Sequence, residues 1–332
     1  MSWYPSESRP GMSNASRPAP TAAPTAPFAP PVPYSHAATP TSSTLGRMPL
    51  APAFAVPIEA EVVSRADFLH VMLRAALGAN HLAPVTASSY ILDVGCGSGR
   101  WVREMAGAFP GARVVGMDIA VPSDGGYGSP GISGTFAISG ISGISGASQP
   151  GAPRTYAFVE HNALEPFSFV PASFDFTHMR QMASALPVAA WPRVVGEMAR
   201  VTAFGGWVEL VEGDLVRNGG PALETIQRWA LQALLPQGLD PRIAPQLPDL
   251  LCRLSLTDVQ TRMVELPVGS HGGRFGELMA ADLLARIEGM RGHIVAARLA
   301  TADEFTRAQA SVRLEMNRNA YVQPFYVVWG RR

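Results

Sequence analysis

One stretch, residues 91–101 with the sequence ILDVGCGSGRW, constrains the fold more than any other. It begins as an apolar strand that carries Asp93 and then has glycine at positions 95, 97 and 99. Glycine lacks a Cβ atom, so the backbone can turn sharply there and come close to a bound molecule. A buried strand that ends in such a turn before a helix is typical of α/β folds that bind ligands at the carboxyl ends of their strands.

The rest of the chain alternates apolar strands with amphipathic helices. The predicted strands are residues 90–94, 112–117, 155–159, 173–179, 205–212, 259–268 and 323–330. The predicted helices are residues 64–80, 100–109, 191–201, 221–235, 274–299 and 303–319. Since alternating strands and helices form a parallel sheet covered on both faces, the predicted fold class is α/β and doubly wound. Its binding crevice then lies beyond the carboxyl ends of the strands.

Two segments have a composition unsuited to a hydrophobic core. Residues 1–57 are dominated by Pro, Ala, Ser and Thr, and we expect a disordered tail ahead of a domain at 58–332. The tail contains APPVP, so a docking site for a protein partner is a second interpretation. Residues 123–154 repeat Ile-Ser-Gly, which indicates a surface loop inserted between two strands. The mostly helical residues 215–320 are expected to form a lid over the substrate.

Charge and cysteine content narrow the class of protein. Lys plus Arg and Asp plus Glu both number 26, so no basic excess points to nucleic acid. No apolar run is long enough to span a membrane, and the beginning of the sequence has no apolar secretory core. We read Cys96 and Cys252 as free thiols in a reducing compartment, and no metal-ligand spacing is present. The expected location is the cytoplasm, with the nucleus left open.

The glycine turn discriminates between two adenosine-containing ligands. A nicotinamide dinucleotide needs a third glycine where Arg100 stands, and its pyrophosphate would be repelled by Asp93. S-adenosylmethionine is cationic and has no phosphate, so the Asp93 carboxylate can face its ammonium group. The backbone of Gly95, Cys96 and Gly97 can then approach the methionine part of the molecule. The turn therefore favours S-adenosylmethionine.

Residues after the next two strands complete this predicted cofactor site. Asp118 ends the second strand, where a carboxylate can accept hydrogen bonds from the ribose hydroxyls, and Ile119 can offer an apolar surface to the adenine. After the third strand, Asn162 has an amide for the adenine edge and Ala163 supplies a backbone N–H. The alternative is that Asp93 and Asp118 only cap turns and that Asn162 is an ordinary loop residue.

The stretches ILDVGCGSGRW, VVGMDIA, HNALEPFSF, SFDFTHMRQM and WPRVVGEMARVTAFGGWVELVEGD carry a resemblance that covers residues 64–214. They resemble class I S-adenosylmethionine-dependent methyltransferases, in particular the trans-aconitate type and fungal regulators of secondary metabolism. The resemblance implies a Rossmann-like sheet of seven strands, mostly parallel with the last strand antiparallel. It also implies methyl transfer to an O, N or C nucleophile. Asn162 departs from the family, which more often has an acid at this place.

The strand at 173–179 supplies the candidates for catalysis. Methyl transfer is an in-line displacement, so alignment of the reactants supplies much of the rate enhancement and a base is not always needed. His178 is the best candidate for a general base, and the alternative is a histidine that is only structural. Arg180 can hold a carboxylate on the substrate. Met179 is expected to line the methionine side of the cofactor, unless it only fills the core.

Three functions compete at this point. The first is an S-adenosylmethionine-dependent methyltransferase that acts on a small molecule. The second is a regulatory protein that binds S-adenosylmethionine and acts through protein partners with little or no catalysis. The third is a nicotinamide-dependent oxidoreductase, which Asp93 and Arg100 disfavour.

Overall fold

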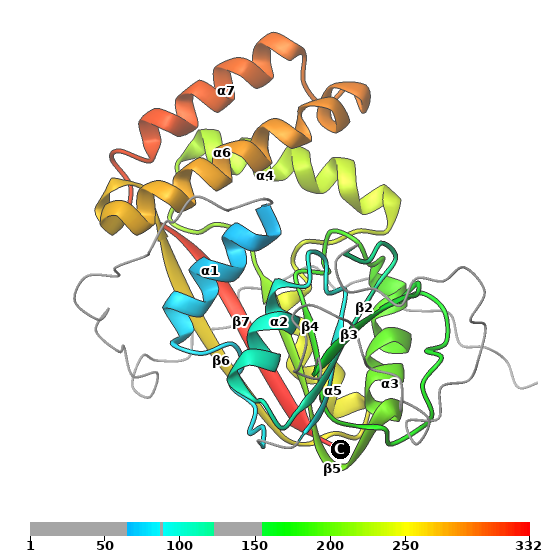
Figure 1. The fold of residues 1–332 in the computed structure, drawn as a ribbon. Coiled ribbons are helices and arrows are strands. Elements are labelled where there is room, and N and C mark those ends of the chain that lie inside the picture. The colour runs from blue at the N-terminus through cyan, green and yellow to red at the C-terminus, as the bar shows by residue number, and fades with distance from the viewer. Residues whose placement is uncertain (1–64, 87–88, 123–154) are drawn as a thin grey trace, which may run out of the picture. The chain divides into compact units, whose positions relative to one another are not determined.

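The computed structural model describes residues 65–86, 89–122 and 155–332, so the predicted tail at 1–57 and the predicted loop at 123–154 lie outside the described residues. The described part contains a sheet of seven strands in the order β3-β2-β1-β4-β5-β7-β6 (Figure 1). The strands are β1 Tyr90–Val94, β2 Arg113–Asp118, β3 Tyr156–Glu160, β4 Phe174–Arg180, β5 Thr202–Gly213, β6 Thr257–Val268 and β7 Tyr321–Arg331. Neighbouring strands from β3 to β5 are parallel, and β7 is antiparallel to both β5 and β6. This arrangement confirms the predicted fold class.

Helices cover both faces of this sheet. They are α1 Arg65–Leu77, α2 Arg100–Ala108, α3 Trp191–Val201, α4 Pro221–Leu234, α5 Leu247–Arg253, α6 Gly273–Ala296 and α7 Ala302–Glu315. The seven predicted strands and six predicted helices are all present, with ends that differ by at most four residues. Among the α-helices of the described residues, only α5 was not predicted.

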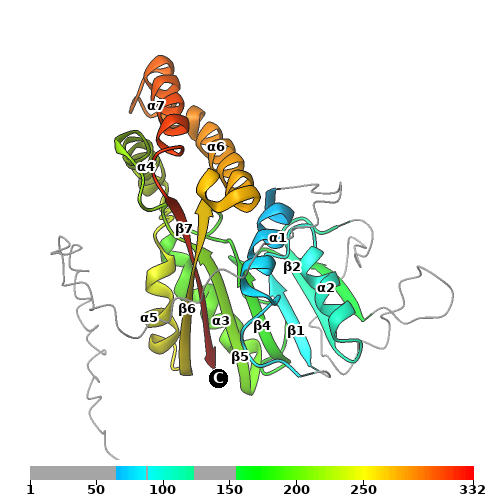
Figure 2. The same ribbon diagram turned by 90° about the vertical axis from the view of Figure 1, so that its left-hand side faces the viewer.

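Alternation along β1 explains the two layers of helices. Ile91 packs with Trp101 of α2 in one hydrophobic cluster, and its neighbour Leu92 packs with Trp191 of α3 in another. Because successive side chains of a strand point to opposite faces, these two contacts belong to opposite sides of the sheet. Figure 2 shows α2 on one side and α3 with α5 on the other.

A third layer lies beyond the carboxyl ends of the parallel strands. It is formed by α4, α6 and α7, above the sheet in Figure 1. A separate hydrophobic cluster joins it to the strand ends through Leu223 of α4, Met279 of α6 and Phe305 of α7. The helical layer therefore stands over the edge at which a ligand of this fold is expected. Its role as a lid stays a prediction.

Candidate cofactor and acceptor site

The glycine turn after β1 is fixed by backbone hydrogen bonds to β2. The N–H groups of Gly95 and Cys96 both donate to the carbonyl oxygen of Met117, at 2.7 and 3.1 Å. Gly95 and Gly97 have φ angles of 72° and 53°, which side chains disfavour. A Cβ at Gly95 would lie 2.4 Å from the sulfur of Met182, whereas a Cβ at Gly97 would meet nothing within 4 Å. A Cβ at Gly95 would therefore require the Met182 side chain to move, whereas Gly97 faces open space.

Asp118 closes the turn from the end of β2. Its Oδ2 accepts a hydrogen bond from the N–H of Gly97 at 2.8 Å, and its Oδ1 accepts one from Ala120 at 3.2 Å. These bonds hold the carboxylate beside the turn, and its contact with a ribose stays a prediction. The next residue, Ile119, has a side chain that is 68% exposed, so an apolar surface is open next to this carboxylate.

Asp93 has a buried partner on the neighbouring strand. The register pairs it with His178, and the Nδ1 atom of His178 lies 2.8 Å from its Oδ1 atom. The imidazole stacks on Trp101 with ring centroids 4.1 Å apart. Burial lowers the pKa of His178, although the hydrogen bond to Asp93 acts in the opposite direction. A neutral ring that donates its Nδ1–H to the carboxylate fits these contacts.

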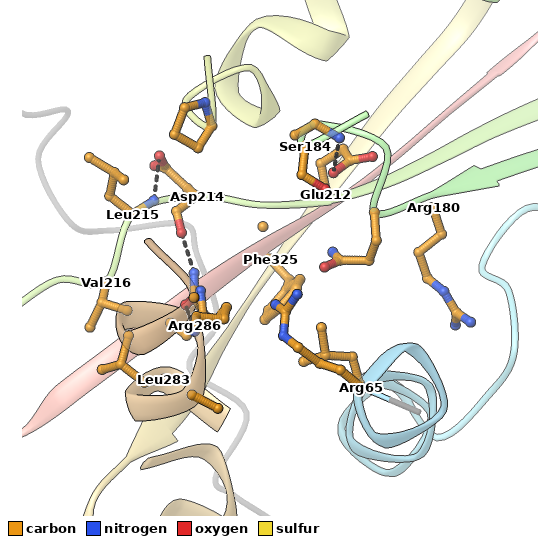
Figure 3. Close-up of a pocket in the computed structure, with 18 of the residues that line it drawn as sticks. Arg65, Arg180, Ser184, Glu212, Asp214, Leu215, Val216, Leu283, Arg286 and Phe325 are labelled. Atoms are coloured by element: carbon orange, nitrogen blue, oxygen red, sulfur yellow. Dashed lines mark hydrogen bonds between the residues drawn. The ribbon is translucent and has the colours of Figure 1, made fainter. Parts of the chain in front are cut away.

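A cavity of about 690 Å³ begins at the glycine turn and extends toward α4 and α6. At the turn it is lined by Asp93, Gly95, Cys96 and Gly97. Farther along, its walls are largely apolar, and Figure 3 shows part of this region. We refer to this distal part, lined by residues of α4 and α6, by Arg65 of α1 and by Phe325, as the apolar chamber. One continuous space thus joins the turn to the helical layer.

A comparison with known protein families decides what kind of protein this is. The family model described as a methyltransferase domain matches residues 69–251, which is more than half of the chain. The chain belongs to this methyltransferase family. Together with the strand order, the match makes it a class I methyltransferase whose cofactor is S-adenosylmethionine. The nicotinamide interpretation is therefore dropped.

Relatives of this methyltransferase include both an enzyme and a regulator. The chain is 28% identical over 223 residues to methyltransferase str3 of Strobilurus tenacellus, covering 64% of this chain and 69% of that protein. It is 27% identical over 232 residues to the secondary metabolism regulator laeA of Aspergillus fumigatus, covering 65% of this chain and 53% of that protein. A solved structure of Haemonchus contortus phosphoethanolamine N-methyltransferase 2 with S-adenosyl-L-methionine is 15% identical, with a TM-score of 0.43. The match covers 79% of this chain and about half, 51%, of that chain.

The residues at the turn fit this cofactor. The carboxylates of Asp93 and Asp118 stand at the ends of adjacent parallel strands. A cationic compound without phosphate can bind beside two carboxylates without charge repulsion. The open space at Gly97 leaves room for a ligand close to the backbone. The thiol of Cys96 is buried and burial raises its pKa, so it stays protonated and brings no further charge. Both cysteines are free, as predicted.

His178 does not line the cavity of the methyltransferase. Its side chain is 1% exposed, and its Nε2 atom has no hydrogen-bond partner among the described residues. A general base must come within reach of the proton that it removes. A role as base therefore stays a prediction, and the geometry favours the alternative, a structural histidine that positions Asp93.

Five predicted cofactor residues do not line the cavity either, namely Asp118, Ile119, Asn162, Ala163 and Met179. Asn162 is exposed, and its Oδ1 accepts a hydrogen bond from the N–H of Leu164 at 2.9 Å, so it closes its own turn. Ala163 is half-buried beside it. Met179 is fully buried in the cluster that also contains Val94, which matches the alternative of core filling. Contacts of these residues with the cofactor stay predictions.

Arg180 and Glu212 line the cavity, but neighbouring groups engage both side chains. The Nη2 atom of Arg180 lies 3.0 Å from Nδ1 of His70, and Figure 3 shows the guanidinium directed toward α1. The carboxyl group of Glu212 accepts hydrogen bonds from the N–H groups of Met182 at 2.5 Å and Ala183 at 3.3 Å. Burial raises the pKa of Glu212 to about 8.

Sequence reasoning missed the contribution of α1 to the site. Asp67 is buried, lines the cavity and accepts a hydrogen bond from the hydroxyl of Ser98 in the glycine turn. His70 is buried as well and lies on the same side of the helix. The sequence does contain a sign of this contribution, in the spacing of Asp67, His70 and Arg74. Residues three and four positions apart lie on one face of a helix, so this spacing predicts a polar stripe.

The described residues offer neither a metal site nor a membrane-spanning helix. Within residues 65–86, 89–122 and 155–332, His, Cys, Asp and Glu form no cluster of three or more that could hold a metal ion. In the same ranges, no helix has the length and apolar character needed to cross a bilayer.

Proposed function

We propose that this chain moves the methyl group of S-adenosylmethionine to a small-molecule acceptor bound in the apolar chamber. The cavity carries this proposal, because its volume of about 690 Å³ lies in the range of small-molecule sites and it joins Asp93 and the glycine turn to the apolar chamber. The cofactor, when bound, supplies a methyl group already activated by its sulfonium. The chain then has to bind, orient and shield the reactants from water.

The described residues supply each of these tasks. In this proposal Asp93 binds the ammonium group; its hydrogen bond with His178 and the open space at Gly97 support that role. Apolar side chains such as Leu223 and Phe325 exclude water from the chamber. Orientation of this kind can supply much of the rate enhancement of a displacement reaction. Glu212 lies in the cavity wall, and its carboxyl group takes part in packing through hydrogen bonds from the N–H groups of Met182 and Ala183.

Calorimetry with S-adenosylmethionine and with NAD tests the cofactor part of the proposal. We expect binding of the former and none of the latter. Replacing both carboxylates, Asp93→Asn with Asp118→Asn, should weaken that binding at least tenfold, because each carboxylate loses a charge-assisted contact. Unchanged affinity for S-adenosylmethionine in this double variant would contradict the assignment of the glycine turn as the cofactor site.

Radiolabelled methyl transfer to a metabolite extract tests the catalytic part. A labelled small molecule is expected only when the active chain is present. The specific observation that favours a second function is the 27% identity to the regulator laeA. Tight cofactor binding with no labelled product in any extract would favour a regulatory protein that acts through partners.

A further inference from the structure

The wall of the apolar chamber contains two arginines that share one carboxylate. The Nε atom of Arg65 on α1 donates to Oδ1 of Asp282 at 2.8 Å. The Nε atom of Arg286 on α6 donates to Oδ2 of the same residue at 2.9 Å. Both arginines line the cavity, whereas the Asp282 side chain lies behind them and is only 3% exposed. This group of three carries one net positive charge.

Neighbouring acids do not neutralise that charge. The carboxylate of Asp214 is already paired with Arg217, with 3.0 Å between Oδ2 and Nη2. Glu212 has a pKa raised by burial to about 8, so its carboxyl group is mostly uncharged at neutral pH. Asp67 and Asp93 line the other end of the cavity, where they face the glycine turn.

The arginines also have unused hydrogen-bond donors. Arg286 uses Nε for Asp282 and Nη2 for Oε1 of Gln323, at 2.8 Å, and its Nη1 has no partner among the described residues. Arg65 uses only Nε in that part of the chain. Burial lowers the pKa of Arg286, and a bound anion would offset this cost. Figure 3 shows the two side chains reaching the chamber from α1 and α6.

Apolar groups surround these donors. On α6, Leu283 and Ile287 flank Arg286 and line the cavity, and Val216 and Phe325 line it too. A ligand that matches both the positive charge of the arginines and the apolar walls has an apolar body and an anionic end. A carboxylate is the anion of choice because guanidinium groups bind it through parallel N–H donors.

We propose that the acceptor is an apolar carboxylic acid whose carboxylate is bound between Arg65 and Arg286. This inference rests on the proposed function, since it names the class of molecule that the chamber takes. It adds Arg65, Asp282 and Arg286 as residues that determine specificity. Asp282 offsets part of the positive charge of the two guanidinium groups and so limits the strength of the anion site.

Matched pairs of probes test the charge preference. Calorimetry in the presence of S-adenosylhomocysteine compares octanoate, 4-phenylbutanoate and cinnamate, each with its primary amide. At least one acid should bind ten times more tightly than its amide, because charge-assisted hydrogen bonds are stronger than neutral ones. Equal or weaker binding of every acid would overturn the inference.

Two substitutions in the group of three should act in opposite directions. Arg286→Met should reduce the affinity of the best acid to that of its amide. Asp282→Asn keeps the size of the side chain and removes the competing charge, so it should strengthen acid binding several-fold. Weaker acid binding in Asp282→Asn would overturn the inference, because a purely structural aspartate predicts that result.

Controls separate this inference from the proposed function. Arg274→Met removes an exposed arginine from α6 that does not line the cavity, and it should leave acid binding unchanged. Affinity for S-adenosylhomocysteine should stay the same in all three variants. If neutral acceptors are methylated and no acid binds, only the inference fails. If acids bind and no acceptor is ever methylated, the proposed function fails, and the anion site between Arg65 and Arg286 stands as a binding site alone.

Discussion

At the scale of single residues, the contact between His178 and Asp93 decides what the histidine does. His178→Phe keeps the aromatic ring on Trp101 and removes the donor to the carboxylate. We expect the affinity for S-adenosylhomocysteine to fall about tenfold, since a hydrogen bond to a charged group contributes roughly 1.5–3 kcal/mol. Calorimetry measures this affinity directly. A general base predicts a different result, a large loss of kcat with unchanged affinity.

The buried carboxyl group of Glu212 predicts a dependence of stability on pH. Its pKa is raised from 4.5 to about 8, so between these values the folded chain keeps a proton that the unfolded chain loses. The free energy of unfolding should therefore fall as the pH rises from 5 to 8, by on the order of a few kcal/mol from this group. In Glu212→Gln this decline should be smaller. Denaturant unfolding at several pH values measures it.

Glu209 sets the control for that experiment. It is also fully buried, its pKa is raised to about 7, and it does not line the cavity. Ionisation of Glu209 also lowers the free energy of unfolding as the pH rises. Glu212→Gln should therefore reduce the dependence of this free energy on pH without removing it. If the free energy of unfolding depends on pH equally in Glu212→Gln and in the unsubstituted chain, Glu212 ionises equally in the folded and unfolded states.

Site residues that are close together in the sequence were predicted, whereas contacts between residues far apart in the sequence were missed. The turn residues Asp93 and Gly97 were predicted because a strand, a glycine pattern and a helix follow one another along the chain. The pair of Arg65 and Asp282 was missed because 217 residues separate them and only the packing of α1 near α6 brings them together. His178 was identified from its position in β4, but its burial depends on Trp101 of α2.

At the scale of elements, hydrophobic periodicity predicted the sheet nearly completely. Strands and long helices repeat their pattern over enough residues to be recognised. The helix α5, Leu247–Arg253, was not predicted because it has only seven residues and has proline at its second position. Its apolar residues Leu247, Leu250 and Leu251 are buried against the sheet, so tertiary packing decides its structure.

The glycine turn allows a matched pair of substitutions. Gly97 and Gly78 have φ angles of 53° and 73°, and a Cβ at either would meet nothing within 4 Å. Alanine should therefore cost about 1–2 kcal/mol of backbone strain at both places. Only Gly97 lines the cavity, so Gly97→Ala should also abolish binding of S-adenosylmethionine, while Gly78→Ala should not. Thermal unfolding and calorimetry on both variants check this, and equal binding would contradict the placement of the cofactor.

At the scale of the whole molecule, the layer of α4, α6 and α7 completes the site that the sheet begins. Its cluster contains residues from Leu69 in α1 to Val327 in β7, so distant parts of the chain share one core. No local pattern states which helices meet over the sheet. The sequence predicted helices in this region, and the chamber that they line emerged only from their packing.

The folded domain should bind its cofactor without residues 1–57. The hydrophobic clusters of the described residues begin at Leu69 and the cavity lining begins at Arg65. A chain that starts at residue 58 should therefore bind S-adenosylmethionine as the full chain does. A ligand at 100 times its Kd adds about 2.7 kcal/mol to the free energy of unfolding. Both chains should show the same rise in Tm, about 5–10 °C. A smaller rise in the shortened chain would assign residues 1–57 to the site.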